Sequence, residues 1–227
     1  KKILITGANG QLGYEMRNVL EGDNRFECLF TDVAELDICD AEAVKSTVAD
    51  NRVNYIVNCA AYTQVDKAED NVELCRKINA EAVENLARAA AECGARMIHI
   101  STDYVFDGRG YRPYTEEMAP DPQSVYGSTK LEGEQALQRL CPESVIIRTA
   151  WLYSPYGNNF VKTMMRLGSE REELSVVADQ VGTPTYAADL AQAILAVLHA
   201  ETFVPGIYHF SDEGACSWYD FTVAIHR

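Results

Sequence analysis

The sequence predicts an α/β protein with a doubly wound parallel sheet and a smaller C-terminal lobe. Up to about residue 150, short apolar segments of strand length alternate with longer segments of helical spacing. A glycine-rich segment joins the first strand to the first helix, and the alternation loosens beyond residue 150. Apolar strands that alternate with helices indicate a parallel sheet covered on both faces. Right-handed crossovers then give the Rossmann type of topology.

The first 150 residues contain the elements of this sheet in order. Apolar runs predict five strands, at 3–5, 26–30, 53–60, 96–101 and 144–149. Helical spacing predicts four helices between them, at 11–20, 41–49, 72–93 and 125–140. The third of these is rich in alanine and glutamate and stops at Gly94, a residue typical of a helix C-terminus. We therefore expect residues 1–150 to form one domain.

The remaining residues predict a smaller and less regular lobe. We expect a helix after Asn158 and Asn159, a short strand at 174–177, the loop DQVGTPTY, a helix at about 187–199 that returns to the main sheet, and a strand at 206–210. Residues 218–227 form an amphipathic helix with no C-capping signal. We therefore expect 151–227 to be an incomplete lobe, with the natural protein continuing beyond it.

The glycine loop is TGANGQLG, from Thr6 to Gly13, directly between a strand and a helix. Gly7, Gly10 and Gly13 permit a tight turn, in which backbone N–H groups at the positive end of the helix approach a pyrophosphate. The loop thus predicts a dinucleotide site and makes 1–150 a dinucleotide-binding domain. A structural strand-to-helix turn could also use three glycines.

Two further strand ends fit the same cofactor. Asp32 follows the second strand at about the spacing expected for a carboxylate that accepts hydrogen bonds from the ribose hydroxyls and repels a 2′-phosphate. It therefore favours NAD, although a solvated turn residue is the alternative. Ala60 and Ala61 end the third strand, where small side chains would let the backbone approach the cofactor. Close packing would explain them equally well.

The catalytic prediction rests on Tyr126 and Lys130, at positions i and i+4 of a helix and hence on one face. An ammonium near a phenol favours the phenolate and lowers the tyrosine pKa. Such a tyrosine can protonate a carbonyl oxygen as hydride reaches its carbon. Thr102, at the end of the fourth strand, would hydrogen-bond the same oxygen. We expect these three residues to be catalytic, with Lys130 also holding the nicotinamide ribose.

Composition excludes several other functions. The net charge of −14 makes binding to nucleic acid or to an anionic membrane unfavourable. No apolar stretch reaches the ~20 residues that span a bilayer, and no signal peptide precedes the first strand, so we expect a cytoplasmic protein. The seven cysteines form no C-x-x-C pair and are expected to be reduced thiols. The histidines show no ligand spacing, and we interpret His99 as a core residue rather than a base.

Six segments together resemble one family, the dTDP-4-dehydrorhamnose reductases, which are extended short-chain dehydrogenases. They are TGANGQLGYE, NCAAYTQVDKAE, STDYVFDG, YGSTKLEGE, RTAWLYSPYGNNFVKTM and DQVGTPTY. The G-x-x-G-x-x-G spacing is also the variant found in that class. The resemblance covers essentially the whole chain. It implies NADPH- or NADH-dependent reduction of the C4 keto group of dTDP-4-dehydro-L-rhamnose to dTDP-L-rhamnose, a step of nucleotide-sugar biosynthesis.

The resemblance also implies roles for individual residues. Asp103 matches a sugar contact, and Trp151 matches an aromatic residue beside the sugar, with a core tryptophan as the alternative. Asn159 begins a helix whose free N–H groups would meet the substrate diphosphate, with an ordinary N-cap as the alternative. The cofactor contacts that the resemblance implies are Gly10, Gln11, Leu12, Asp37, Ile38, Ala61, Tyr62, Thr63 and Asn79.

Some members of the family hold Mg²⁺ at a dimer interface through acidic residues. Glu15 matches one such position and Asp189 a second only in part, so a homodimer and an interface ion stay open, and we assign no metal ligand. Two other functions also stay open. The regulatory β subunit of methionine adenosyltransferase resembles the same family but binds a dinucleotide without catalysis. An epimerase or dehydratase is the third reading, but Asp103 is followed by Tyr104 where a dehydratase would usually have a glutamate.

Overall fold

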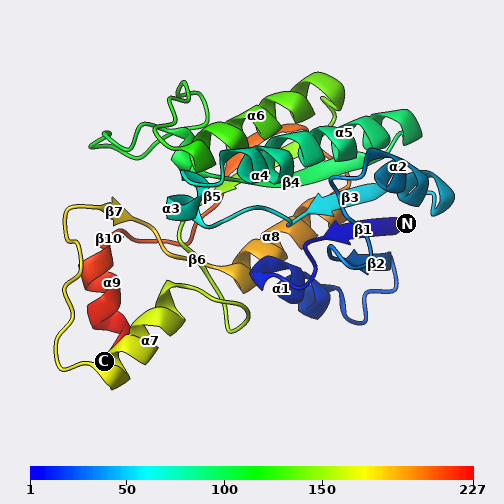
Figure 1. Ribbon diagram of the computed structural model, residues 1–227. Coiled ribbons are helices and arrows are strands. Elements are labelled where there is room, and N and C mark those ends of the chain that lie inside the picture. The colour runs from blue at the N-terminus through cyan, green and yellow to red at the C-terminus, as the bar shows by residue number, and fades with distance from the viewer.

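The computed structural model describes residues 1–227, and a six-stranded sheet forms its centre (Figure 1). The strand order is β2-β1-β3-β4-β5-β9, and every neighbouring pair is parallel. The strands are β1 (Lys2–Thr6), β2 (Glu27–Thr31), β3 (Tyr55–Asn58), β4 (Arg96–Thr102), β5 (Val145–Thr149) and β9 (Gly206–His209). The predicted doubly wound parallel sheet is confirmed. Its sixth strand, β9, comes from the part of the chain beyond residue 150.

Helices cover both faces of this sheet (Figure 1). On one face lie α1 (Gln11–Leu20) and α8 (Ala187–His199), and on the other lie α2 (Ala41–Asp50), α5 (Ala82–Cys93) and α6 (Val125–Leu140). Successive strand residues point to opposite faces, so Ile3 and Ile5 pack with the first pair of helices and Leu4 with the second set. Helix α8, which the sequence predicts to return to the main sheet, packs in the structure against this face with Ile3 and Ile5.

The helix predicted at 72–93 is not continuous. It consists of α4 (Val72–Arg76), a π-helical turn at Lys77–Glu81 and α5, which ends as predicted at Gly94 with a φ of +67°. A short helix α3 (Val65–Ala68) precedes it. The π turn carries Asn79, and a Cβ on Gly133 of α6 would collide with the Asn79 carbonyl. Single π turns of this kind are frequent at functional sites, and this one brings the α4–α5 segment into close contact with α6.

The smaller lobe contains two helices and four two-residue strands. It lies beside one end of the sheet (Figure 1). The elements are α7 (Phe160–Glu170), α9 (Trp218–Ile225), β6 (Leu152–Tyr153), β7 (Val181–Gly182), β8 (Thr185–Tyr186) and β10 (Cys216–Ser217). β7 pairs antiparallel with β10, and β6 pairs parallel with β8. The prediction of a strand at 174–177 is wrong. That segment has no strand neighbour, and the Val177 carbonyl instead accepts a hydrogen bond from Tyr219 N.

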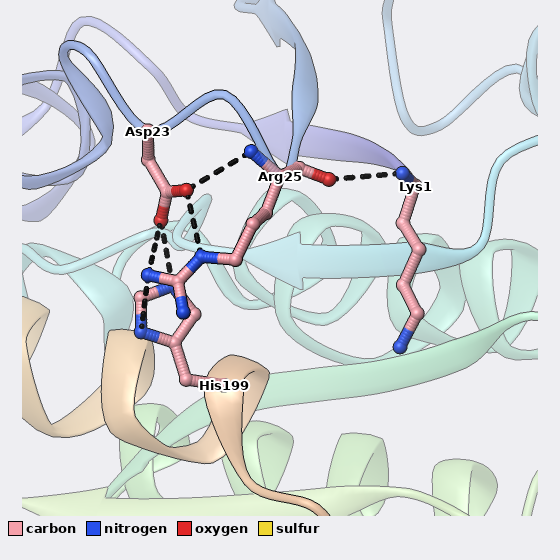
Figure 2. A network of polar contacts seen from close by, with 4 residues as sticks. All are labelled: Lys1, Asp23, Arg25 and His199. Carbon is pink, nitrogen blue, oxygen red and sulfur yellow. Dashed lines mark hydrogen bonds and ion pairs between the residues drawn. The ribbon is translucent and has the colours of Figure 1, made fainter.

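A polar network ties the loop between α1 and β2 to the end of α8 (Figure 2). His199 Nε2 lies 2.6 Å from Asp23 Oδ2, and Arg25 Nη2 lies 3.1 Å from His199 Nδ1. Arg25 also donates to Asp23 Oδ1 over 2.9 Å, and its carbonyl accepts from the terminal amine of Lys1 over 3.0 Å. Both ring nitrogens of His199 are therefore engaged in this network, Nδ1 as an acceptor from Arg25 and Nε2 as a donor to Asp23.

This network predicts a pH-dependent contribution to stability. Hydrogen bonds from Arg25 hold the pKa of Asp23 well below its usual range. A carboxyl whose pKa is depressed by folding stabilises the protein above its unfolded-state pKa, and this stabilisation is lost as the pH falls toward the folded-state pKa. We expect Asp23→Asn to lower the thermal unfolding midpoint at neutral pH, and the difference from wild type to shrink below about pH 4. A difference that stays constant in unfolding scans across this range would contradict the assignment.

Two general features of the chain complete the description. All seven cysteines are free thiols, and Cys75 and Cys141 are buried. None of the helices combines the length and the apolar character that crossing a bilayer requires.

Candidate active site

Most of the predicted site residues come from the carboxyl ends of β1, β2, β3 and β4 and from the beginnings of α1 and α6. In a doubly wound sheet, ligands bind outside the carboxyl ends of the strands. Thr102 ends β4, and Tyr126 and Lys130 lie in the first two turns of α6. The Ser124 side chain caps α6 by accepting from Gly127 N, which sets where the helix begins. A Cβ on Gly127 would collide with the Tyr104 carbonyl, so this glycine lets α6 approach the end of β4.

The glycine loop lies tightly against β3 and α1. Gly7 has a φ of +64°, and a Cβ there would lie 2.6 Å from Ala60 N. A Cβ on Gly13 would collide with the Gly7 carbonyl. Gly10 is the N-cap of α1 and offers no side-chain cap, so the first N–H groups of the helix keep their hydrogen-bonding capacity. Close packing explains two of the glycines, and the uncapped helix end suits a phosphate group.

Asp32 lies next to this loop at the end of β2. Its Oδ2 accepts from Asn9 N over 3.0 Å, and its Oδ1 accepts from Val33 N over 2.8 Å. The carboxylate therefore also holds the glycine loop, a role the sequence did not indicate.

Two other predicted cofactor residues follow this strand. Asp37 accepts from Cys39 N over 2.9 Å, and the Ile38 side chain is buried in the core on the α5 face.

Asn79, which is predicted to contact the cofactor, hydrogen-bonds the backbone of Tyr62, in the loop after β3, with both polar atoms of its side chain. Its Oδ1 accepts from Tyr62 N over 2.8 Å, and its Nδ2 donates to Tyr62 O over 3.1 Å. Ala61 precedes this point and is half-buried, and Thr63 follows it and is exposed. Asn79 thus holds the shape of the loop that carries the other predicted contacts.

The catalytic candidates meet at the end of β4. Thr102 donates through Oγ1 to Asp103 Oδ1 over 3.0 Å and accepts from Tyr104 N over 3.2 Å. The Tyr126 ring packs edge-on against Tyr104, with ring centroids 5.5 Å apart. Thr102 also lies close enough to the Tyr126 hydroxyl to affect its pKa. Lys130 is 1% exposed and donates to the Ile100 carbonyl over 2.6 Å.

The electrostatics of this group differ from the prediction. Burial raises the pKa of Tyr126, and the hydrogen bond from Thr102 opposes that shift. The Lys130 ammonium donates to the Ile100 carbonyl and is not among the groups that shift the Tyr126 pKa. The prediction that this ammonium lowers the Tyr126 pKa is therefore wrong, because burial shifts the pKa upward. Burial also lowers the pKa of Lys130 to about 8, and the Glu134 carboxylate opposes that shift.

His99 and Asn58 belong to this region although sequence analysis gave neither a role there. His99 is fully buried, as expected for a core residue, with Nδ1 3.0 Å from Asn58 Nδ2 and Nε2 3.5 Å from Lys130 Nζ. Burial, with a smaller contribution from Lys130, places the pKa of His99 well below its usual value. The two residues are paired in the β3–β4 register. Only that register brings them together, so no local sequence signal could have identified the pair.

The substrate-side candidates lie where the sheet meets the smaller lobe. Trp151 has a φ of +48°, an uncommon backbone conformation for a large side chain. Its indole stacks on Trp218 with ring centroids 3.5 Å apart, and a Cβ on Gly182 would lie 2.5 Å from Trp151 Cε2. Trp151 is half-buried, and Asp103 is half-buried with a pKa raised by burial. The predicted residue Trp151 is therefore one half of a stacked aromatic pair, of which Trp218 is the other half.

In the structure Asn159 is the N-cap of α7, which was the alternative interpretation of this residue. Its Oδ1 accepts from Lys162 N over 3.1 Å and so begins α7. Its Nδ2 donates to Gln11 Oε1 over 2.9 Å and to Ser154 O over 2.7 Å. Gln11 begins α1 next to Leu12, which is buried beneath the sheet. Asn159 therefore links the glycine-loop helix to the smaller lobe.

The acidic residues considered for an interface ion do not form a site within this chain. Glu15 is buried and its Oε1 has no hydrogen-bond partner, whereas Asp189 is exposed. No group of three or more His, Cys, Asp or Glu side chains is arranged to hold a metal. An ion between two copies of the chain stays a prediction about an assembly.

Comparison with known proteins gives a consistent result. A family model described as "RmlD substrate binding domain" matches residues 1–227. A dTDP-4-dehydrorhamnose reductase of Aggregatibacter actinomycetemcomitans is 46% identical over 99% of this chain and 78% of its own length. The crystal structure of a dTDP-4-dehydrorhamnose reductase from Clostridium acetobutylicum has a TM-score of 0.96 at 52% identity, covering 100% of this chain and 80% of that one. A Bacillus anthracis structure of the same description, in complex with NADP, has a TM-score of 0.95 at 46% identity, covering 99% and 79%.

Proposed function

This chain belongs to the RmlD family, the dTDP-4-dehydrorhamnose reductases, and from that premise we propose that Tyr126, Lys130 and Thr102 carry its reaction. The reaction is reduction of the C4 keto group of dTDP-4-dehydro-L-rhamnose by NADPH or NADH. The observation that supports this assignment is the meeting of Thr102, Tyr126 and Lys130 at one sheet edge, beside the glycine loop. The nucleotide cofactor, when bound, supplies the hydride.

The glycine loop fits such a cofactor. The uncapped beginning of α1 offers backbone N–H groups to the pyrophosphate, because Gly10 leaves them without a side-chain acceptor. Gly7 lets the loop lie against the end of β3, and Gly13 lets α1 lie against the loop, without steric conflict. The Tyr62 backbone, fixed by Asn79, forms the neighbouring wall. Together these features leave backbone donors without side-chain partners at the carboxyl end of β1, where a pyrophosphate would bind.

The chain's own residues move and hold the proton. Tyr126 is protonated across the neutral pH range because burial raises its pKa. It can therefore donate its phenolic proton to the oxygen that becomes a hydroxyl. Thr102 lies beside the phenol at the end of β4, and Lys130, one turn later on α6, would hold the nicotinamide ribose. Trp151 and Asp103 are proposed to place the sugar over this group.

Turnover measured through the absorbance of the reduced nicotinamide tests this proposal. Full-length protein is mixed with dTDP-4-dehydro-L-rhamnose and each cofactor, and cofactor oxidation is followed. We expect oxidation that depends on the sugar nucleotide. A protein that binds the cofactor tightly but never oxidises it would instead favour the non-catalytic, regulatory alternative.

Cofactor preference gives a separate prediction at Asp32. The side chain adjoins the glycine loop, where its charge would repel a 2′-phosphate. We expect Asp32→Ala to raise the ratio of kcat/KM for NADPH over NADH by roughly tenfold. Glu35→Ala is the matched control, since it removes a neighbouring carboxylate that accepts from Asp32 N. An unchanged ratio would mean that Asp32 serves only the loop contacts with Asn9 and Val33.

A further inference from the structure

A chain of buried polar groups runs beneath the site from β1 to Lys130. Thr6 Oγ1 donates to Asn58 Oδ1 over 2.7 Å, and Asn58 Nδ2 lies 3.0 Å from His99 Nδ1. His99 Nε2 then lies 3.5 Å from Lys130 Nζ. All four side chains are at most 1% exposed, so each polar atom depends on these neighbours. The chain therefore connects the strand of the glycine loop to the lysine of the catalytic group.

The direction of the hydrogen bonds in this chain is determined by a backbone group. Ala60 N, 3.1 Å from Asn58 Oδ1, can only donate, so its partner on Asn58 must be the amide oxygen. The remaining atom of the Asn58 amide is then the NH₂ group, which donates to His99 Nδ1. A nitrogen that accepts carries no proton. Since burial keeps His99 neutral, its one ring proton is on Nε2, the nitrogen that faces Lys130.

We propose that His99 is a positioning residue for Lys130, because it presents an N–H group instead of a lone pair to the ammonium. This inference rests on the proposed function, in which Lys130 acts beside Tyr126. Two donors cannot hydrogen-bond each other, so the Ile100 carbonyl is the one acceptor that the protein gives the ammonium. Two of its three N–H donors consequently remain for the cofactor ribose and the phenol. If Nε2 carried a lone pair instead of a proton, it would accept a hydrogen bond from one of these two N–H donors.

The other charged or titratable groups that face Lys130 raise its pKa, whereas burial lowers it. Glu134, one turn later on α6, and Cys75 on α4 both raise its pKa. Glu134 is itself paired with Arg148, and this ion pair weakens the effect of Glu134 on the Lys130 pKa. Burial outweighs both groups and brings the Lys130 pKa to about 8. An N–H group facing the amine acts in the same direction as burial, because it disfavours the ammonium and can donate to the neutral amine.

The tautomer can be read directly in the unmodified, full-length protein. Two-bond ¹H–¹⁵N correlation spectra of ¹⁵N-labelled protein distinguish a protonated from an unprotonated ring nitrogen. We expect the His99 signal to show a bare Nδ1 and a protonated Nε2, unchanged from about pH 6 to about pH 9. The opposite tautomer, or a protonated ring in that range, overturns the proposal. This result does not depend on whether the protein reduces any sugar.

Two substitutions at His99 test the consequence for Lys130. His99→Gln places an amide oxygen near the former Nε2 position, where it accepts from the ammonium. His99→Asn keeps an acceptor for Asn58 but places no atom near Lys130. We expect His99→Gln to raise the Lys130 pKa, read as the alkaline limb of kcat/KM, by about one pH unit, with a smaller rise for His99→Asn.

Thermal unfolding and the ¹⁵N titration of Lys130 Nζ separate the outcomes. Equal losses of stability in both variants, with no shift of the lysine titration, would make His99 a packing residue and overturn the proposal. A shift of the titration in the expected order supports it. If that shift appears while Tyr126→Phe keeps full turnover, the proposed function fails and the positioning of Lys130 by His99 stands.

Discussion

Replacing Tyr126 by phenylalanine is expected to lower kcat by about 10²–10⁴-fold while leaving cofactor affinity unchanged. The substitution removes one hydroxyl and keeps the ring that packs edge-on against Tyr104. It leaves no proton donor at this position, and Thr102 alone is too weak an acid to replace the phenol at neutral pH. Binding is unaffected because the glycine loop and Lys130 are untouched. Steady-state turnover and cofactor titration by fluorescence measure the two effects separately.

Tyr104→Phe is the matched control for this experiment. It removes the same group from the adjacent ring, which is 40% exposed. We expect turnover close to wild type, since only the Tyr104 backbone contacts Thr102 and Gly127. Full turnover in Tyr126→Phe would contradict the assignment of the proton donor. A comparable loss in both variants would point to the packing of the two rings instead of proton transfer.

The fold was predictable wherever the local hydrophobic pattern was clear. The bounds of α1, α6 and α8 match the prediction because the apolar spacing that defines each helix lies within the segment itself. The segment 174–177 failed for the opposite reason. A short strand exists only where a neighbour offers paired hydrogen bonds, and in this lobe β10 pairs with Val181–Gly182. The π turn at Asn79 likewise arises from contact with α6, which no window of sequence contains.

The candidate site was likewise predictable only where the information lies within one segment of sequence. Tyr126 and Lys130 could be proposed as a pair because their spacing on one helix is local information. Their pKa values could not be predicted, because burial and the Ile100 carbonyl, which belong to other elements, determine them. The Asn58–His99 pair depends on the register of β3 against β4. Residue identities therefore indicated the chemistry, and tertiary contacts determine its electrostatics.

The second large effect concerns stability, at a buried ion pair behind the catalytic lysine. Arg148 on β5 donates to Glu134 on α6 through two bonds of 3.0 and 2.7 Å, and the side chains are 3% and 1% exposed. The Arg148 guanidinium also lies over the Phe106 ring. We expect Arg148→Met to reduce the free energy of unfolding by about 3–5 kcal/mol, because it leaves a buried carboxylate without its partner. Denaturant unfolding measures this loss.

The double variant Arg148→Met/Glu134→Leu isolates the cause. Removing both charges also removes both desolvation costs, so we expect a stability within about 1 kcal/mol of wild type. Equal instability in the single and double variants would mean that lost packing, not an unpaired charge, explains the effect. The double variant also removes the carboxylate that raises the Lys130 pKa. The alkaline limb of kcat/KM should therefore move to lower pH in this stable protein, opposite to the shift expected for His99→Gln, and the two variants together bracket the pKa at which Lys130 loses its charge.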